Sequence, residues 1–169
     1  VRKTNYGNNE IYVINAHNAP NTMREIGRLR EWAFRESGGG TGKSMDIDEF
    51  DTRDEAYFEQ LIVWDPVEKE ILGGYRFIEC NKLPIKNNGQ VDTPTSELFY
   101  YSEEFIKNYL PYTIELGRSF VQPKYQSTGN VRKSIYTLDN LWYGLGAVLT
   151  QTPNAKYFFG NVTMYSQYD

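Results

Sequence analysis

Acidic residues gather around one aromatic residue in the segment DIDEFD, at positions 46–51. The carboxylates of Asp46, Asp48 and Asp51 could hold a cationic substrate or position arginine side chains through charge-assisted hydrogen bonds. On composition alone, a run of acidic residues is more often a loop in contact with water. The segment is therefore a candidate substrate-binding site, and a solvated acidic loop is the alternative.

Two opposite charges interrupt the apolar segment 112–121, which reads YTIELGRSFV. Burying Glu115 and Arg118 is costly unless the two are paired or functional. Residues three apart face opposite sides of a regular strand, but Gly117 could permit a bulge that re-aims one of them. A structural ion pair between Glu115 and Arg118 and a functional role for both therefore stay open.

Strand and helix patterns surround these residues. The segments 11–15, 57–65, 70–80, 112–121 and 156–164 have the β-branched and aromatic content of strands, and a turn at 66–69 predicts a hairpin. Apolar residues three and four apart predict helices over 18–37 and 131–150, and Ser102 is a candidate N-cap for a shorter helix over 102–110. The apolar positions of the two long helices are Met23, Ile26, Leu29, Trp32 and Ala33, then Ile135, Leu138, Leu141, Trp142, Leu145 and Leu149. The order β-α-β-β-α-β-α-β predicts a mixed α/β fold.

The composition bounds the class of protein. With 169 residues, 40% hydrophobic and 24% charged, the chain fits one domain over 1–169 with a real core. The net charge of −4 and the lack of a basic run argue against nucleic acid as a partner. No apolar stretch is long enough to cross a membrane, and the first residues lack the apolar core of a signal peptide. We therefore expect a cytoplasmic protein.

The sequence contains few side chains that could carry out thiol chemistry or bind a metal ion. Cys80 is the only cysteine and His17 the only histidine, which excludes an internal disulfide and leaves too few Cys and His ligands for a zinc site. A Ser-His-Asp hydrolase would need His17 as its base, yet this residue lies in the turn-like segment NAHNAPN and fits a surface or capping position better. We expect no metal site.

The charged residues occur in an order that resembles acyl-homoserine-lactone synthases. Those enzymes carry an Arg and a Phe four apart on the first helix, an acidic E-x-D-x-(aromatic)-D motif, an Arg in the third strand and E-x-x-R in the fourth. The matching positions here are, in order, Arg30, Phe34, Asp46, Asp48, Asp51, Arg76, Glu115 and Arg118. One position departs from the pattern, because Asp46 stands where the synthases have Glu.

The segments ELGRSFVQPKYQ, LDNLWYGLGAVL and KYFFGNVTMYS are more similar to the sister group, the ornithine-lipid and other N-acyl amino acid synthases, also called hemolysin-like proteins. Both groups have the GNAT acyltransferase fold, and the predicted order of elements matches it as far as its fifth strand. The chain stops at SQYD, where that fold would still need its closing strands. We therefore expect a truncated chain with an open sheet edge along 156–162, where a dimer or a second chain could pair.

The resemblance implies an N-acyltransferase that moves a fatty acyl group from an acyl carrier protein or coenzyme A thioester to the amino group of an amino acid or related amine. Glu115 would be the general base. The thioester would lie along Ser119, Phe120 and Val121, and no cofactor would stay bound permanently. The substrate-binding residues would be Arg30, Phe34, Asp46, Asp48, Asp51, Arg76 and Arg118. The family's phosphate-binding loop, which uses a helix N-terminus, would comprise Gln126, Gly129, Asn130 and Val131.

Two other functions stay open at this point. A homoserine-lactone signal synthase would require S-adenosylmethionine as a second substrate. A non-catalytic lipid-binding or partner-binding module could keep the same fold, since 15% aromatic residues suit a binding surface as well as a pocket. Lys124, Arg132 and Lys133 could meet the acidic surface of a carrier protein. Peripheral contact with a membrane is also open.

Overall fold

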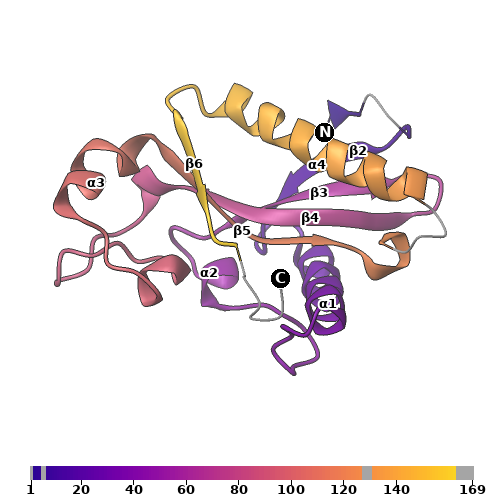
Figure 1. The fold of residues 1–169 in the computed structure, drawn as a ribbon, viewed down its shortest axis with the longest axis horizontal. Coiled ribbons are helices and arrows are strands. Elements are labelled where there is room, and N and C mark those ends of the chain that lie inside the picture. Colours follow the sequence, from indigo (N-terminus) through magenta and orange to yellow (C-terminus); the bar gives the residue numbers. More distant parts are fainter. Residues whose placement is uncertain (1, 5–6, 127–130, 163–169) are drawn as a thin grey trace, which may run out of the picture.

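The computed structural model describes residues 2–4, 7–126 and 131–162 and is built on one mixed sheet (Figure 1). The strands follow one another across the sheet in chain order, β1 to β6, and only the β5–β6 pair is parallel. The strands are β1 (Arg2–Lys3), β2 (Glu10–Ile14), β3 (Glu59–Asp65), β4 (Glu70–Glu79), β5 (Thr113–Val121) and β6 (Tyr157–Gly160). The helices are α1 (Pro20–Glu36), α2 (Glu49–Thr52), α3 (Glu103–Asn108) and α4 (Val131–Gln151), with 3₁₀ turns η1 (Cys80–Lys82), η2 (Pro94–Glu97), η3 (Leu110–Tyr112) and η4 (Pro123–Tyr125).

The predicted order of elements is confirmed, with two additions. β1 and the short helix α2 have no counterpart among the predicted elements, since each is too short to carry a periodic pattern. Ser102 caps α3 as predicted, because its hydroxyl accepts a hydrogen bond from the Phe105 amide at 3.1 Å. The last predicted strand is shorter than expected: β6 ends at Gly160, and positions 163–164 lie outside the described residues.

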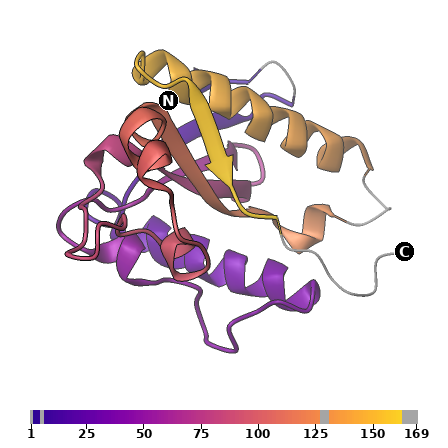
Figure 2. The same ribbon diagram turned by 60° about the vertical axis from the view of Figure 1, so that its left-hand side comes forward.

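Helices α1 and α4 cover opposite faces of the sheet (Figure 2). α1 buries Met23, Ile26, Leu29 and Ala33 against the sheet residues Ile62, Ile71 and Phe120. This agrees with the predicted apolar face, except that Trp32 is 37% exposed. α4 packs on the other face against a cluster that includes Leu61, Leu72 and Tyr75. Each face of the sheet therefore has its own apolar layer, and polar side chains that point into a layer need specific partners.

Much of the predicted apolar face of helix α4 is exposed to solvent. Leu141 and Val148 are buried against the sheet, whereas Trp142 is 78% exposed. The other exposed members of the predicted set are Ile135, Leu138 and Leu149. The physical reason is the close approach at Gly144, where an added Cβ would lie 2.8 Å from a methyl group of Leu61. The helix is confirmed, but tertiary contact rather than apolar spacing selects its buried face.

β6 pairs with only the first half of β5. The parallel pairing runs from Thr113 to Leu116, and the last pair is Leu116 with Gly160. On the other side, the register with β4 shifts between Gly74 and Arg76, so β5 carries a bulge just after Gly117. The second half of β5 therefore has β4 on one side and no strand on the other within the described part of the chain.

The orientation of α4 generates a stability prediction from two chemically identical changes. Leu141→Ala removes a side chain buried in the core and should lower the free energy of unfolding by about 2–5 kcal/mol. Leu138→Ala changes a side chain that is 56% exposed and should cost less than about 1 kcal/mol. Urea unfolding followed by circular dichroism measures both. Equal losses would mean that α4 packs on a different face.

Candidate active site

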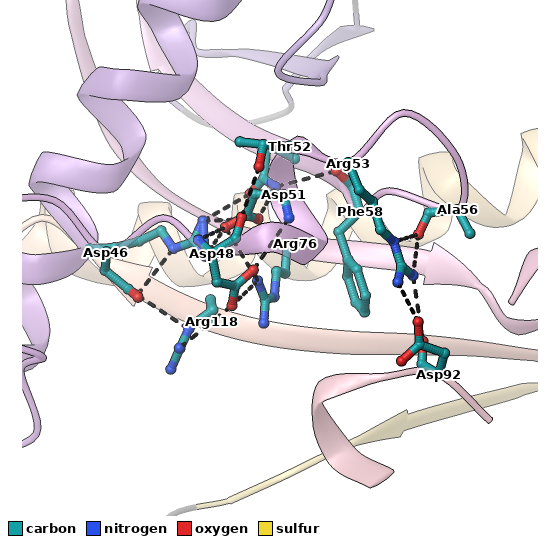
Figure 3. A network of polar contacts seen from close by, with 12 residues as sticks. Asp46, Asp48, Asp51, Thr52, Arg53, Ala56, Phe58, Arg76, Asp92 and Arg118 are labelled. Atoms are coloured by element: carbon teal, nitrogen blue, oxygen red, sulfur yellow. Dashed lines mark hydrogen bonds and ion pairs between the residues drawn. The ribbon is translucent and has the colours of Figure 1, made fainter. Parts of the chain in front are cut away.

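The acidic segment folds into the short helix α2, which holds two of its carboxylates in fixed positions. Asp48 is the N-cap, and its carboxylate accepts from the Asp51 amide at 3.3 Å. Asp51 returns the contact by accepting from the Asp48 amide at 3.2 Å. This reciprocal capping box satisfies two amides of the helix N-terminus. It also turns both carboxylates toward the sheet (Figure 3).

Arg30 reaches Asp51 from helix α1 in the interior of the protein. Its Nη1 and Nη2 atoms lie 3.4 and 3.2 Å from the two carboxylate oxygens of Asp51. Gln60 of β3 donates a further hydrogen bond to Asp51 at 2.9 Å. Arg30 and Asp51 are both 0% exposed. Burial lowers the pKa of Arg30, and the Asp51 carboxylate opposes that effect. Such a pair is stable only because each charge has its counter-charge in hydrogen-bonding reach.

Arg76 of β4 extends the same network. Its Nη1 atom lies 2.7 and 2.8 Å from the two oxygens of Asp48 and 3.3 Å from Asp51. Its guanidinium also stacks over the Phe58 ring, 4.8 Å from the centroid. Burial works against the charge on Arg76, but the carboxylates of Asp51 and Asp48 outweigh it and raise the pKa of Arg76. In turn, Arg76 overcomes the effect of burial and lowers the pKa of Asp48.

Arg118 of β5 forms the outer edge of the network. Its Nε atom lies 3.2 Å from Asp46 and its Nη2 atom 3.8 Å from Asp48 (Figure 3). The guanidinium also lies over the Phe34 ring at 6.0 Å. Unlike Arg30 and Arg76, the Arg118 side chain is 38% exposed, so a ligand can reach it. Its backbone φ of +52° is strained for a residue other than glycine, and such strain often marks functional positions.

The solvated-loop interpretation of the acidic segment is therefore wrong. Asp46 and Asp51 are 3% and 0% exposed, and both are paired with arginines. The structural ion pair between Glu115 and Arg118 is wrong as well, because the bulge turns Arg118 toward Asp46. Within the described residues, Glu115 forms no ion pair.

Glu115 lies on β5 in a separate cluster of polar side chains. The hydroxyl of Thr95 donates to its Oε1 atom at 2.7 Å, and the hydroxyl of Thr93 donates to its Oε2 atom. The side-chain amide of Asn161 donates in turn to the Thr95 hydroxyl oxygen at 3.1 Å. Sequence reasoning missed Thr93, Thr95 and Asn161. The T-P-T-S segment at 93–96 does signal a capped turn, but nothing in it points to Glu115.

A groove runs between α1, β5 and the start of α4. Its volume is ≈ 420 Å³, which is in the range of small-molecule sites. The lining residues are Ala33, Phe34, Ser37, Ser119, Phe120, Val121, Gln126 and Leu138. The groove therefore gathers Phe34 and four residues predicted to bind the acyl donor. A second cavity of ≈ 520 Å³, near the N-terminal half of α1, contains none of the predicted site residues.

The predicted phosphate-binding loop is only partly described. The Gln126 amide donates to the Val121 carbonyl, so this side chain ties the loop to the end of β5. Gly129 and Asn130 lie outside the described residues, and Val131 is the first residue of α4. In the described part of the chain, no group of three His, Cys, Asp or Glu side chains could hold a metal ion. Over the same residues, no helix has the length and apolar character needed to span a membrane.

Comparison with known proteins gives three findings. The family model described as "Acetyltransferase (GNAT) domain" matches residues 29–134. Two curated proteins named glycine N(alpha)-acyltransferase, from Bacteroides thetaiotaomicron and Phocaeicola vulgatus, are 58% and 54% identical over 99% of this chain. The alignments cover 50% and 51% of those proteins, so the chain spans about half the length of the curated relatives it matches.

Solved structures with a similar arrangement are more distant. An aminoglycoside acetyltransferase from an uncultured soil metagenomic sample, in complex with sisomicin, is 12% identical with a TM-score of 0.48, over 92% of this chain and 78% of that one. An acetyltransferase of Trypanosoma brucei is 10% identical with a TM-score of 0.46, over 92% of this chain and 83% of that one.

A glycine-rich loop joins α1 to the acidic segment, and Glu31 holds it in place. The Glu31 carboxylate accepts from the Thr41 hydroxyl at 2.6 Å, from the Thr41 amide at 2.9 Å and from the Gly42 amide at 2.9 Å. Arg35 adds an ion pair at 2.7 Å. The Thr41 hydrogen bond is the main reason that the pKa of Glu31 falls to about 2. The Glu31 carboxylate therefore fixes the glycine-rich loop between α1 and the acidic segment.

The low pKa of Glu31 predicts an acid-dependent release of this loop. Because the folded pKa is about 2 and the ordinary value is 4.5, the stabilisation is complete above pH 4.5 and is lost as pH falls through 2. The amide resonances of Thr41 and Gly42 should therefore titrate near pH 2 in nuclear magnetic resonance spectra. Glu31→Gln should abolish that titration. A wild-type midpoint near pH 4.5 would show that the loop does not hold the carboxylate.

Proposed function

The chain belongs to the acetyltransferase (GNAT) domain family, and on that premise we propose that it transfers an acyl group from a thioester to the amino group of glycine or a similar amino acid. The two curated relatives carry the name glycine N(alpha)-acyltransferase, which supports glycine as the acceptor. The resemblance to N-acyl amino acid synthases supports a fatty acyl group. The acceptor, the acyl group and the role of each residue below are parts of this proposal.

One observation carries the proposal: within the described residues, the second half of β5 lacks a strand partner on the side of β6. A pantetheine arm contains amide groups, which can pair with a strand edge as an added strand does. The same backbone carries Ser119, Phe120 and Val121, which line the groove beside Phe34. The thioester would therefore lie along β5, with its reactive carbonyl near Gly117, where β5 and β6 separate.

The acceptor would bind at the exposed edge of the charge network. Arg118 offers a guanidinium that is 38% exposed and held by Asp46 and Asp48. A guanidinium pairs with a planar carboxylate in a fork geometry, so it suits the carboxylate of an amino acid. The buried members of the network, Arg30 and Asp51, would position Arg118 indirectly rather than touch the substrate.

Glu115 would accept the proton that the amine must lose. The reaction joins the acceptor nitrogen to the thioester carbonyl carbon, breaks the carbon–sulfur bond and leaves a thiolate, which takes up one proton. An ammonium acceptor loses two protons overall, one of them to solvent. General base catalysis of this kind requires the carboxylate within hydrogen-bonding reach of the amine, directly or through one bridging group.

Both donors named by the resemblance, acyl carrier protein and coenzyme A, present the same pantetheine arm. Their phosphate would lie toward the N-terminus of α4, next to Gln126. Helix N-termini favour anions there through their free amides and dipole. Lys124, which forms an ion pair with Glu70 at 2.7 Å, would lie on the approach of a carrier protein.

Turnover assays test the activity directly. The protein is incubated with an acyl-carrier-protein thioester or an acyl-coenzyme A and with glycine, ornithine or S-adenosylmethionine, and thiol release and acylated product are measured. Glycine should be acylated fastest. Thiol release only with S-adenosylmethionine would support a homoserine-lactone synthase, and no release with any combination would support a non-catalytic binding module.

A conservative substitution at Glu115 should separate catalysis from folding. Glu115→Gln keeps the shape but removes the base, so turnover should fall by about 10²–10⁴-fold while donor binding is retained. Glu79→Gln makes the same chemical change at a partly exposed carboxylate paired with Lys82 and should keep the wild-type rate. Rates and melting temperatures are recorded for both variants. A folded Glu115→Gln variant with wild-type turnover would contradict the assignment.

The acceptor assignment predicts a selective effect at Arg118. Arg118→Lys keeps the charge but loses the fork geometry, so KM for glycine should rise by about 10–100-fold, in line with one or two charge-assisted hydrogen bonds. The KM for the acyl donor should change little. Arg28→Lys, at an exposed arginine paired with Glu25, is the matched control. A larger change in donor KM than in glycine KM would place Arg118 at the donor instead.

A further inference from the structure

Glu115 has little open surface through which to meet a substrate. Its side chain lies in the interior, and the residue is 3% exposed. Each carboxylate oxygen accepts from a threonine hydroxyl, Oε1 from Thr95 and Oε2 from Thr93. An amine bound beside Arg118 would therefore exchange its proton with this carboxylate most directly through one of those hydroxyls.

The two hydroxyls differ in what they contact on their other side. The Thr95 oxygen also accepts from the side-chain amide of Asn161 at 3.1 Å, and Asn161 is exposed at the surface. A continuous hydrogen-bonded chain thus leads from the surface through Thr95 to Glu115. Thr93 instead contacts Ser96 through its backbone, within the same capped turn. In the described residues, only the Thr95 hydroxyl continues by a side-chain hydrogen bond toward the surface.

This path opens at the point where the two strands separate. Gly160 pairs with Leu116 in the last rung of the β5–β6 ladder, so Asn161 is the first residue beyond it. Arg118 lies further along β5, with its guanidinium partly exposed. The outer end of the hydrogen-bonded path therefore lies where β5 and β6 separate, and Arg118 is the second residue of β5 beyond the last paired position, Leu116.

We propose that Thr95 is the proton relay between the acceptor amine and Glu115, an inference that rests on the function proposed above. The Thr95 oxygen takes one proton from the acceptor ammonium, and the Thr95 hydroxyl proton passes to Glu115 Oε1. The nitrogen, now neutral, bonds to the thioester carbonyl carbon, and the proton that it loses after attack goes to the departing thiolate. Thr95 ends with one proton, as it began, and Glu115 becomes neutral. Asn161 marks the place where the amine or a bridging water meets the relay.

The other titratable groups around Glu115 in the described part of the chain do not compete for this proton. The Glu115 charge acts on Cys80 of η1 and on Tyr101, which precedes α3, and it favours the protonated form of each. Burial raises the pKa of Cys80 to about 12, and burial likewise raises the pKa of Tyr101 well above its ordinary value. Both groups therefore keep their protons near neutral pH and cannot accept another. Among the described residues, Glu115 is the only carboxylate that accepts hydrogen bonds from the two threonines.

The test compares Thr95→Val with Thr93→Val, two isosteric changes that each remove one hydroxyl from the same carboxylate. The relay predicts that Thr95→Val lowers kcat by about 10²–10⁴-fold at neutral pH with the donor KM unchanged. Thr93→Val should lower kcat by less than about 10-fold, although its melting temperature should fall as much as that of Thr95→Val. Thr95→Ser restores a hydroxyl and should regain most of the activity.

A pH profile adds a readout that a purely structural role would not move. The defect of Thr95→Val should shrink as pH rises, because the acceptor then arrives as a neutral amine with less need of a base. Equal losses of kcat in the two valine variants, or a Thr95→Val defect that is the same at every pH, would overturn the relay. If the wild-type protein releases no thiol with any acceptor, the proposed function itself fails, which separates the two conclusions.

Discussion

The buried ion pair between Arg30 and Asp51 is the interaction on which the rest of the site depends. Both residues are fully enclosed, and a charge in that position is tolerated only with a counter-charge and further hydrogen bonds. The pair joins α1 to α2, Gln60 ties it to β3, and Arg76 ties it to β4. Because these elements are fixed to one another, the direction in which the network reaches the surface is fixed as well.

The network reaches the surface at β5. Two groups of polar side chains lie there, one on each side of Gly117. The arginine–aspartate network ends at Arg118, and the threonine-held carboxylate Glu115 lies three residues earlier. A regular strand would turn these side chains to opposite faces, but the bulge and the positive φ of Arg118 bring them to one side. The strained backbone at Arg118 thus has a structural consequence: it places the Arg118 cation and the Glu115 carboxylate beside the point where β5 and β6 separate.

The separation of β5 from β6 gives the site its shape. A paired β6 along the whole of β5 would leave no free strand edge and would bury Gly117. The pairing stops at Leu116, so the backbone beyond it borders a groove whose walls come from α1, β5 and α4. Rigid elements therefore surround the groove on three sides, which is the condition for holding reacting groups in a fixed geometry.

The sequence by itself determined the order of the elements, the first helix with its buried face and the β3–β4 hairpin, because these follow from local periodicity and spacing. The group of charged residues that meet was expected from the resemblance to acyl-homoserine-lactone synthases. Tertiary structure alone decided which charges pair. Asp46 rather than Glu115 binds Arg118, since a bulge of one residue re-aims the side chain. It also decided the buried face of α4 through the contact at Gly144. Thr93 and Thr95 come to Glu115 from a distant segment, and Asn161 comes to Thr95 from another. No local pattern encodes contacts across 22, 20 or 66 residues of chain.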